Sequence, residues 1–171
     1  MDSAELKAIQ TPLKERYREA PESAVVTLRA VGSVEDQAIA CKVETGRALA
    51  IAGLHPATGG SGAELCSGDM LLEALVACAG VTLKAVATAL EFKLDGGTVS
   101  AEGDLDFRGT LGVAKDAPVG FKSIRLHFDL RTEEPKERLD TLIKLTERYC
   151  VVLQTLARSP ALTVAAAGRG G

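Results

Sequence analysis

Residues 62–87 read GAELCSGDMLLEALVACAGVTLKAVA, and this stretch decides the fold. From Ser67 to about Phe92 nearly every residue is apolar or small, which predicts one long helix. Its polar side chains form a single narrow stripe, made of Glu73, Lys84, Thr88 and Glu91. A helix this apolar needs cover nearly all round, and its internal charges favour a core helix over a membrane span.

The start and the middle of this helix carry further signals. Ser67 is predicted to cap it, and Asp69 in its first turn complements the helix dipole. Cys78 lies about 140° around the helix from Glu73, at the regular 100° per residue. We therefore expect the Cys78 thiol to face away from the polar stripe.

Two strands with clean alternation are predicted after the helix. Apolar residues occupy every second position in 99–107 and again in 124–130. Such alternation indicates a sheet with one packed face and one solvated face, typical of antiparallel pairing. Gly96-Gly97 closes the helical region, and the connection at 109–120 is a candidate lid.

Three short antiparallel strands are predicted before the helix. Residues 25–28 are rich in β-branched side chains, 39–43 alternate, and 47–52 follow a turn at Thr45-Gly46. We expect a turn at Gly32–Asp36. The loop that follows these strands is glycine-rich but lacks the Gly-Lys-Ser/Thr ending of a phosphate-binding loop, so it is interpreted as a flexible connector.

The last long helix is predicted from Pro135 to about Arg158, where Ser159-Pro160 stops it. Cys150 falls on its buried stripe, which repeats at spacings of three and four. Residues 161–166 are expected to form a final strand. Helix and strand order together predict an α+β fold with antiparallel sheet.

At the other end of the chain, residues 3–19 predict an amphipathic segment interrupted at Pro12. We interpret residues 1–22 as a helical extension and 23–171 as a single domain.

Composition excludes several classes of function. The 171 residues are 46% hydrophobic and 25% charged, with a net charge of -3, which is the mix of an ordinary globular domain. The basic residues are scattered, and four Phe, two Tyr and no Trp offer no stacking platform for nucleic acid. The first ten residues lack the layout of a secretion signal, so we expect a cytoplasmic protein.

The four cysteines are Cys41, Cys66, Cys78 and Cys150. None are spaced as C-x-x-C, which makes a four-cysteine metal site improbable and predicts no metal. A single cysteine on an apolar face is most often a small buried hydrophobe, and Cys41 and Cys66 are interpreted so. Cys78 and Cys150 would form a redox pair if the fold brings them together.

Residues 62–87, together with LTERYCVVLQTL at 145–156, resemble the OsmC/Ohr family of thiol-dependent peroxidases. GDLDFRGTLGV at 103–113 and PVGFKSIRLHFDL at 118–130 resemble the OsmC-like branch of that family. The resemblance covers roughly residues 24–165. It implies antiparallel sheets wrapped around central helices in an intertwined homodimer, with two active sites at the dimer interface.

The resemblance also assigns roles. The cysteine matching Cys78 attacks an organic hydroperoxide and becomes a sulfenic acid, which Cys150 condenses to a disulfide. An external dithiol, such as a lipoylated protein, restores both thiols, and no bound cofactor is needed. Ohr-type members use a hairpin arginine, held by a carboxylate at the start of the cysteine helix, to favour the thiolate.

In this chain Asp69 stands where OsmC-like members usually carry Glu. The ungapped alignment places the arginine position near Gln37, so Arg29 or Arg47, on neighbouring predicted strands, would have to substitute. Two hypotheses therefore stay open. One is an organic hydroperoxide reductase. The other is a non-enzymatic binder of a hydrophobic ligand, or a redox sensor, on the same fold.

Overall fold

The computed structural model describes residues 2–5, 8, 10–11, 19, 31–34, 40–44, 49–112 and 114–168. Most of the predicted N-terminal segment, the boundary expected near residue 22 and the strand expected at 25–28 lie outside these residues. So do Arg29, Gln37 and Arg47. The described residues form an α+β fold whose long strands pair antiparallel, as predicted.

The first sheet has the order β1-β2-β3-β4, and its pairs are antiparallel except β3–β4. Its strands are β1 Val31–Val34, β2 Ala40–Glu44, β3 Leu49–Gly53 and the two-residue β4 Leu65–Cys66. The strands expected at 39–43 and 47–52 are thus confirmed. The turn expected at Gly32–Asp36 is wrong over its first residues, because Gly32 and Ser33 pair with Val43 and Lys42 of β2. Ladder pairing overrides the turn preference of glycine and serine there.

Helix α2 runs from Ser67 to Ala89, ending slightly before the predicted Phe92. Asp69 lies in its first turn as expected, but the predicted cap is wrong. Strand β4 leads straight into the helix, so Cys66 takes the cap position in extended backbone and makes no side-chain cap hydrogen bond. A short 3-10 helix, η2 Pro56–Thr58, occupies part of the preceding glycine-rich loop.

Strands β5 (Gly96–Leu105) and β6 (Phe121–Arg131) form a long antiparallel hairpin, with Val99 opposite Phe128. The predicted alternation is confirmed: their apolar side chains are partly buried, and the intervening polar ones are exposed. Two boundaries differ. Gly96-Gly97 opens the strand rather than preceding it, and Phe107 lies in a short helix, α3 (Phe107–Thr110), which Asp106 caps.

The final helix is broken, contrary to the single helix predicted. Helix α4 covers Lys136–Tyr149 and α5 covers Val151–Ala157, with Cys150 in extended backbone between them. The break leaves carbonyl groups of α4 without helical partners, and the Gln154 side chain donates to one of them, the Glu147 oxygen, at 2.8 Å. The expected strand at 161–166 is also wrong, because these residues are exposed and unpaired.

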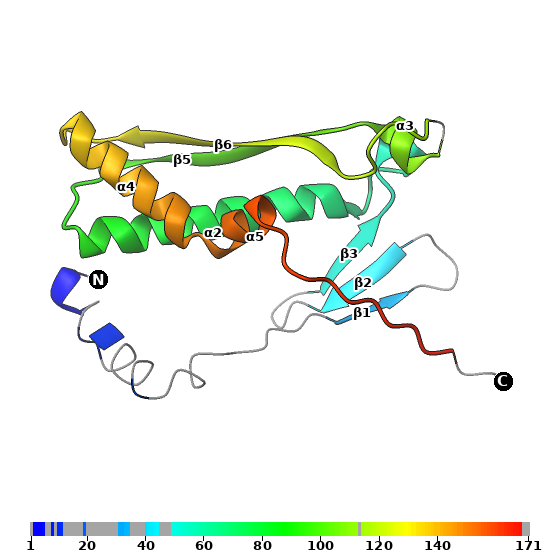
Figure 1. Ribbon diagram of the computed structural model, residues 1–171, viewed down its shortest axis with the longest axis horizontal. Coiled ribbons are helices and arrows are strands. Elements are labelled where there is room, and N and C mark those ends of the chain that lie inside the picture. The colour runs from blue at the N-terminus through cyan, green and yellow to red at the C-terminus, as the bar shows by residue number, and fades with distance from the viewer. Residues whose placement is uncertain are drawn as a thin grey trace.

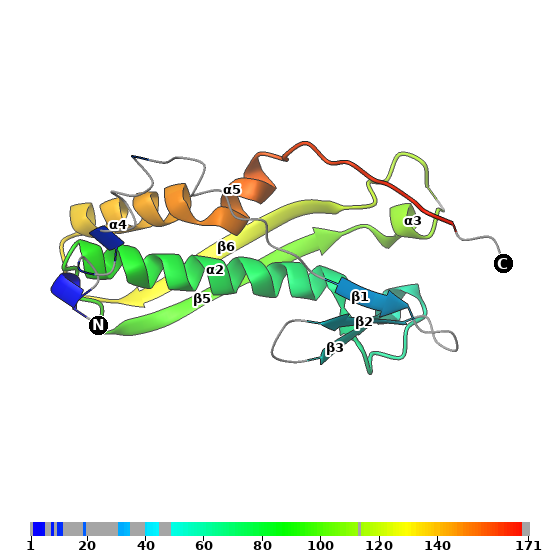
Figure 2. The ribbon, with the colours of Figure 1, turned by 90° about the horizontal axis from the view of Figure 1, so that it is seen from below.

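Helix α2 lies beneath the β5–β6 hairpin, with α4 and α5 alongside it (Figures 1 and 2). The first sheet lies near the N-terminal end of α2, on the side away from the hairpin. Two buried clusters fill the interior of this arrangement. One centres on Leu83 and Leu142, and the other on Leu75, Ala79 and Cys150.

Helix α2 is covered on one side only among the described residues. Its fully buried side chains are spaced four apart, at Leu75, Ala79, Leu83 and Ala87. On another face Val81 is 73% exposed. By length and composition the helix is long and apolar enough to cross a membrane, but the core helix of a globular protein meets the same test. The described residues therefore leave incomplete the cover expected nearly all round the helix.

Candidate active site

The two cysteines singled out from the sequence meet in the second buried cluster. Cys78, half-buried in the middle of α2, packs against a group formed by Leu75, Ala79 and Cys150. Cys150 is fully buried at the α4–α5 junction. The two thiols are close enough that each shifts the pKa of the other, lowering that of Cys78 and raising that of Cys150. Cys66, Cys78 and Cys150 are free thiols.

The surroundings of Cys78 favour its thiolate. Burial raises the pKa of Cys78, but four hydrogen bonds outweigh it and hold that pKa below the ordinary value. They come from the backbone N–H of Val152, the Cys150 thiol, the backbone N–H of Val151 and the Thr82 hydroxyl. A lowered thiol pKa raises the thiolate fraction at neutral pH, and the thiolate is the nucleophile.

Cys150 is shifted in the opposite direction. Burial raises the pKa of Cys150, and the neighbouring Cys78 sulfur raises it further, against a backbone hydrogen bond from Leu153. The pair therefore consists of one thiolate and one thiol over a range of pH. Two coupled groups whose pKa values are pushed apart by their environments take different chemical roles.

The break at Cys150 supplies the backbone donors. Val151 and Val152 are the first residues of α5, where N–H groups have no partner within the helix. In an unbroken helix they would bond to carbonyls one turn back, so the break frees them for the Cys78 sulfur. Sequence patterns did not reveal these donors. Thr82 was recognisable, since it lies one turn from Cys78 on the same helix face.

Asp69 is not part of this cluster. Asp69 is exposed in the first turn of α2, about 13 Å along the helix from Cys78 at the usual rise per residue. Arg29 and Arg47 lie outside the described residues. We expected a cation to be needed for the thiolate. Neutral donors already lower the Cys78 pKa in the described structure.

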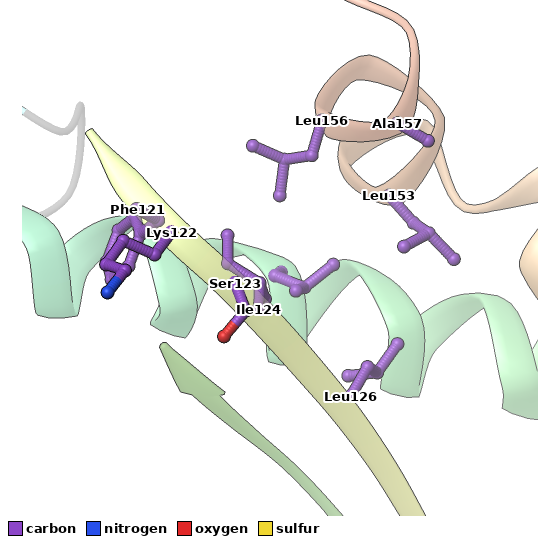
Figure 3. A pocket seen from close by; sticks show the side chains of 9 residues that line it. Phe121, Lys122, Ser123, Ile124, Leu126, Leu153, Leu156 and Ala157 are labelled. Atoms are coloured by element: carbon purple, nitrogen blue, oxygen red, sulfur yellow. The ribbon is translucent and has the colours of Figure 1, made fainter. Parts of the chain in front are cut away.

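An apolar pocket of about 380 Å³ opens beside the thiol pair. Figure 3 shows its lining from strand β6 and helix α5, with Ile124 and Leu126 opposite Leu153 and Leu156. Leu75 and Leu153 line this pocket and also belong to the cluster that surrounds Cys150. The pocket therefore borders the sulfur pair through these two side chains.

The histidines lie elsewhere. His55 stacks on Phe107, with ring centroids 4.8 Å apart, and its Nδ1 accepts a hydrogen bond from the Ala57 N–H. His127 is exposed on the outer face of β6. Within the ranges that the structure describes, no group of three or more His, Cys, Asp or Glu side chains is arranged to hold a metal ion.

Fold and site together define an α+β protein with a paired thiol centre beside an apolar pocket. The family model described as "OsmC-like protein" matches residues 60–165, which is more than half of the chain. The chain belongs to the OsmC-like family. No curated protein is detectably similar to it in sequence.

Solved structures share its fold at low sequence identity. An OsmC-like protein from Mycoplasma pneumoniae superposes with a TM-score of 0.65 at 14% identity, covering 78% of this chain and 89% of that one. An organic hydroperoxide resistance protein from Elizabethkingia anophelis gives 0.61 at 16% identity, covering 77% and 89%. A Legionella pneumophila protein described as an organic hydroperoxide resistance protein, OsmC, gives 0.60 at 16% identity, covering 78% and 90%. At this identity the likeness establishes the fold.

Proposed function

We propose that this chain reduces organic hydroperoxides with Cys78 as the attacking thiolate and Cys150 as the resolving thiol. The packing of Cys78 against the buried cluster that contains Cys150 is the observation that carries the proposal. Cys78 attacks one peroxide oxygen, the O–O bond breaks, and a sulfenic acid and an alcohol form. Cys150 then displaces hydroxide from the Cys78 sulfur to give a disulfide.

The substrate is an apolar hydroperoxide rather than hydrogen peroxide. The pocket beside the thiols is lined mainly by leucine, isoleucine and phenylalanine side chains, and it has room for a small alkyl or aryl group. Burying that group supplies binding energy that hydrogen peroxide cannot obtain. The names of two structural neighbours, organic hydroperoxide resistance proteins, agree with this class of substrate.

An external dithiol, such as a lipoylated protein, regenerates the enzyme without any bound cofactor. Cys78 is the more accessible sulfur, since Cys150 is fully buried, so the dithiol attacks the bridge at Cys78. The disulfide is transient, which suits a cytoplasmic protein in a reducing compartment.

The working unit is a homodimer. The exposed side of α2 carries the charged Glu73 and Lys84 among apolar and small residues, namely Val81, Ala74, Ala77 and Gly80. An ideal Cβ placed on Gly80 meets no atom within 4 Å, so this side is open to a close neighbour. A second copy of the chain supplies that neighbour and buries the rest of the helix.

Intact mass spectrometry after one equivalent of an alkyl hydroperoxide tests the proposal. The wild-type protein should gain one Cys78–Cys150 disulfide, and Cys78→Ser should gain none. Cys66→Ser, which removes a free thiol outside this cluster, is the matched control and should behave as wild type. Unreacted wild-type thiols would contradict the enzyme hypothesis.

The alternative function is a non-enzymatic binder of a hydrophobic ligand or a redox sensor. The apolar pocket favours it, because the same lining would hold a lipid-like molecule without any reaction. A ligand that co-purifies with the protein, together with thiols that do not respond to hydroperoxide, would support this second function.

A further inference from the structure

Four hydrogen-bonding groups meet the Cys78 sulfur, and they differ in whether they can release a proton. Two are backbone N–H groups, of Val151 and Val152, and one is the Thr82 hydroxyl. Amides and aliphatic hydroxyls keep their protons throughout the neutral range. The fourth is the Cys150 thiol, whose class has an ordinary pKa of about 8.5. Within this set, Cys150 alone is a usable acid.

The reaction proposed above needs such an acid. When a thiolate attacks an alkyl hydroperoxide, the departing oxygen leaves as an alkoxide, a far stronger base than any group in the pocket. Proton delivery to that oxygen as the O–O bond breaks lowers the barrier, and general acid catalysis of this kind typically contributes about 10²–10⁴-fold.

We propose that Cys150 is the general acid of the first step as well as the nucleophile of the second. This rests on the proposed function. Cys150 is the buried thiol of the cluster against which Cys78 packs, and Leu75 and Leu153 connect this cluster to the pocket that receives the alkyl group. It therefore shares a cluster with the attacking Cys78 and with two side chains that line the pocket.

The transfer of one proton from Cys150 to the departing oxygen links the two steps. The Cys78 thiolate forms a bond to the terminal peroxide oxygen, the O–O bond breaks, and the Cys150 proton moves to the departing alkoxide. The products are an alcohol, a Cys78 sulfenic acid and a Cys150 thiolate. That thiolate attacks the sulfenic sulfur and expels hydroxide, so two sulfur atoms are oxidised to a disulfide while the peroxide is reduced.

The arrangement also explains why Cys150 is kept protonated until it is needed. Burial and the neighbouring Cys78 thiolate raise the Cys150 pKa, so the proton stays in place before substrate arrives. Protonation of the alkoxide then generates the resolving thiolate where the sulfenic acid has formed. Protonation of the alkoxide in the first step thus supplies the thiolate that the second step needs.

Leaving-group chemistry provides the test. A peroxyacid releases a carboxylate, whose conjugate acid has a pKa of about 4, so its reduction requires no proton donor. Single-turnover rates of peroxide consumption, without reductant, are compared for an alkyl hydroperoxide and a peroxyacid. The proteins are wild type, Cys150→Ala and Cys150→Ser. A change in fold or in thiolate fraction affects both substrates alike, whereas loss of the proton affects the alkyl hydroperoxide alone.

Loss of the Cys150 thiol raises the Cys78 pKa and slows both substrates to the same extent. Beyond that shared slowing, we expect both variants to lose a further factor of about 100 or more with the alkyl hydroperoxide alone. Equal slowing of both substrates, or no slowing of either, would overturn the acid role.

A second experiment uses wild-type protein alone with alkyl hydroperoxides that release alcohols of different acidity. The rate should depend weakly on the acidity of the departing alcohol, and a steep dependence would overturn the inference. Wild-type protein that consumes neither substrate would instead refute the proposed function itself.

Discussion

Cys150, at the point where α4 ends and α5 begins, belongs to the buried cluster against which Cys78 packs from the middle of α2. Neither residue makes this centre alone. Cys78 contributes the half-exposed sulfur, and Cys150 contributes both a buried thiol and the backbone break that frees the N–H groups of Val151 and Val152.

Replacing Thr82 with valine tests its hydrogen bond to the Cys78 sulfur. The pKa of Cys78 should rise, because one of the groups that lower it is lost. A hydrogen bond to a charged group is worth about 1.5–3 kcal/mol when removed, and 1.36 kcal/mol corresponds to one pKa unit. Alkylation of Cys78 by iodoacetamide at neutral pH should therefore slow by about ten-fold or more.

Thr88→Val is the matched control for that experiment. Thr88 lies on the same helix, but its hydroxyl donates to the Lys84 carbonyl at 2.9 Å. Its loss should leave the alkylation rate of Cys78 unchanged. Equal rates in Thr82→Val and wild type would show that Thr82 does not support the thiolate.

The stability of the reduced protein should depend on pH in two opposite ways. Because the Cys78 pKa is lower in the folded state, the free energy of unfolding should rise with pH between the folded-state pKa and the ordinary thiol pKa. In that range the Cys78 thiol is protonated in the unfolded state and ionised in the folded state. The raised Cys150 pKa removes stability above the ordinary thiol pKa, where the unfolded state ionises first. Urea unfolding across a pH series measures both effects.

Single variants separate these two contributions. In Cys78→Ser the rise on the lower side of the ordinary thiol pKa should disappear, and in Cys150→Ser the fall on the upper side should disappear. A wild-type profile that parallels both variants would contradict the opposed shifts.

Filling the pocket should change substrate selection without changing the thiols. Leu156 lines the pocket from α5, and Leu156→Trp should occupy part of its volume. We expect the rate with a bulky aryl hydroperoxide to fall at least about ten-fold, since a poorly accommodated group loses more than about 1.4 kcal/mol of binding. The rate with hydrogen peroxide should not change. Leu162→Trp, at a position that is 81% exposed, is the control.

A charge placed on the open side of α2 should weaken the proposed homodimer. Val81→Glu would put a carboxylate into the interface, and burying an unpaired charge is costly. Sedimentation analysis should show dimers for wild type and a shift to monomers for the variant. Leu111→Glu, at a 56% exposed position after α3, should remain dimeric. A monomeric wild-type protein would refute the dimer.

Local patterns in the sequence were sufficient for much of the fold. The alternation at 99–105 and 124–130 predicted β5 and β6, because burial on one face repeats every second residue. The apolar run after Ser67 predicted α2 in the same way. Strand β1 was missed because pairing with β2, rather than local preference, places Gly32 and Ser33 in a sheet.

The candidate site was only half predictable. The two cysteines stood out by their context, but the helical spacing of apolar residues continues through Cys150 and hides the break. Without the break, the N–H groups of Val151 and Val152 could not be counted among the donors to Cys78. Among the described residues, the backbone amides of Val151 and Val152 and the Thr82 hydroxyl help to lower the Cys78 pKa. The arginines predicted for this role lie outside the described residues.

The pocket shares Leu75 and Leu153 with the cluster around the two cysteines, but most of its lining comes from other residues. Ile124 and Leu156 shape the pocket from β6 and α5, whereas Cys78 belongs to α2. Substitutions in the lining can therefore diversify what the protein accepts while the oxidation chemistry stays constant. Proteins that share this site would then differ more in their substrates than in their reaction. The substitutions that separate them would fall mainly among the residues that line the pocket.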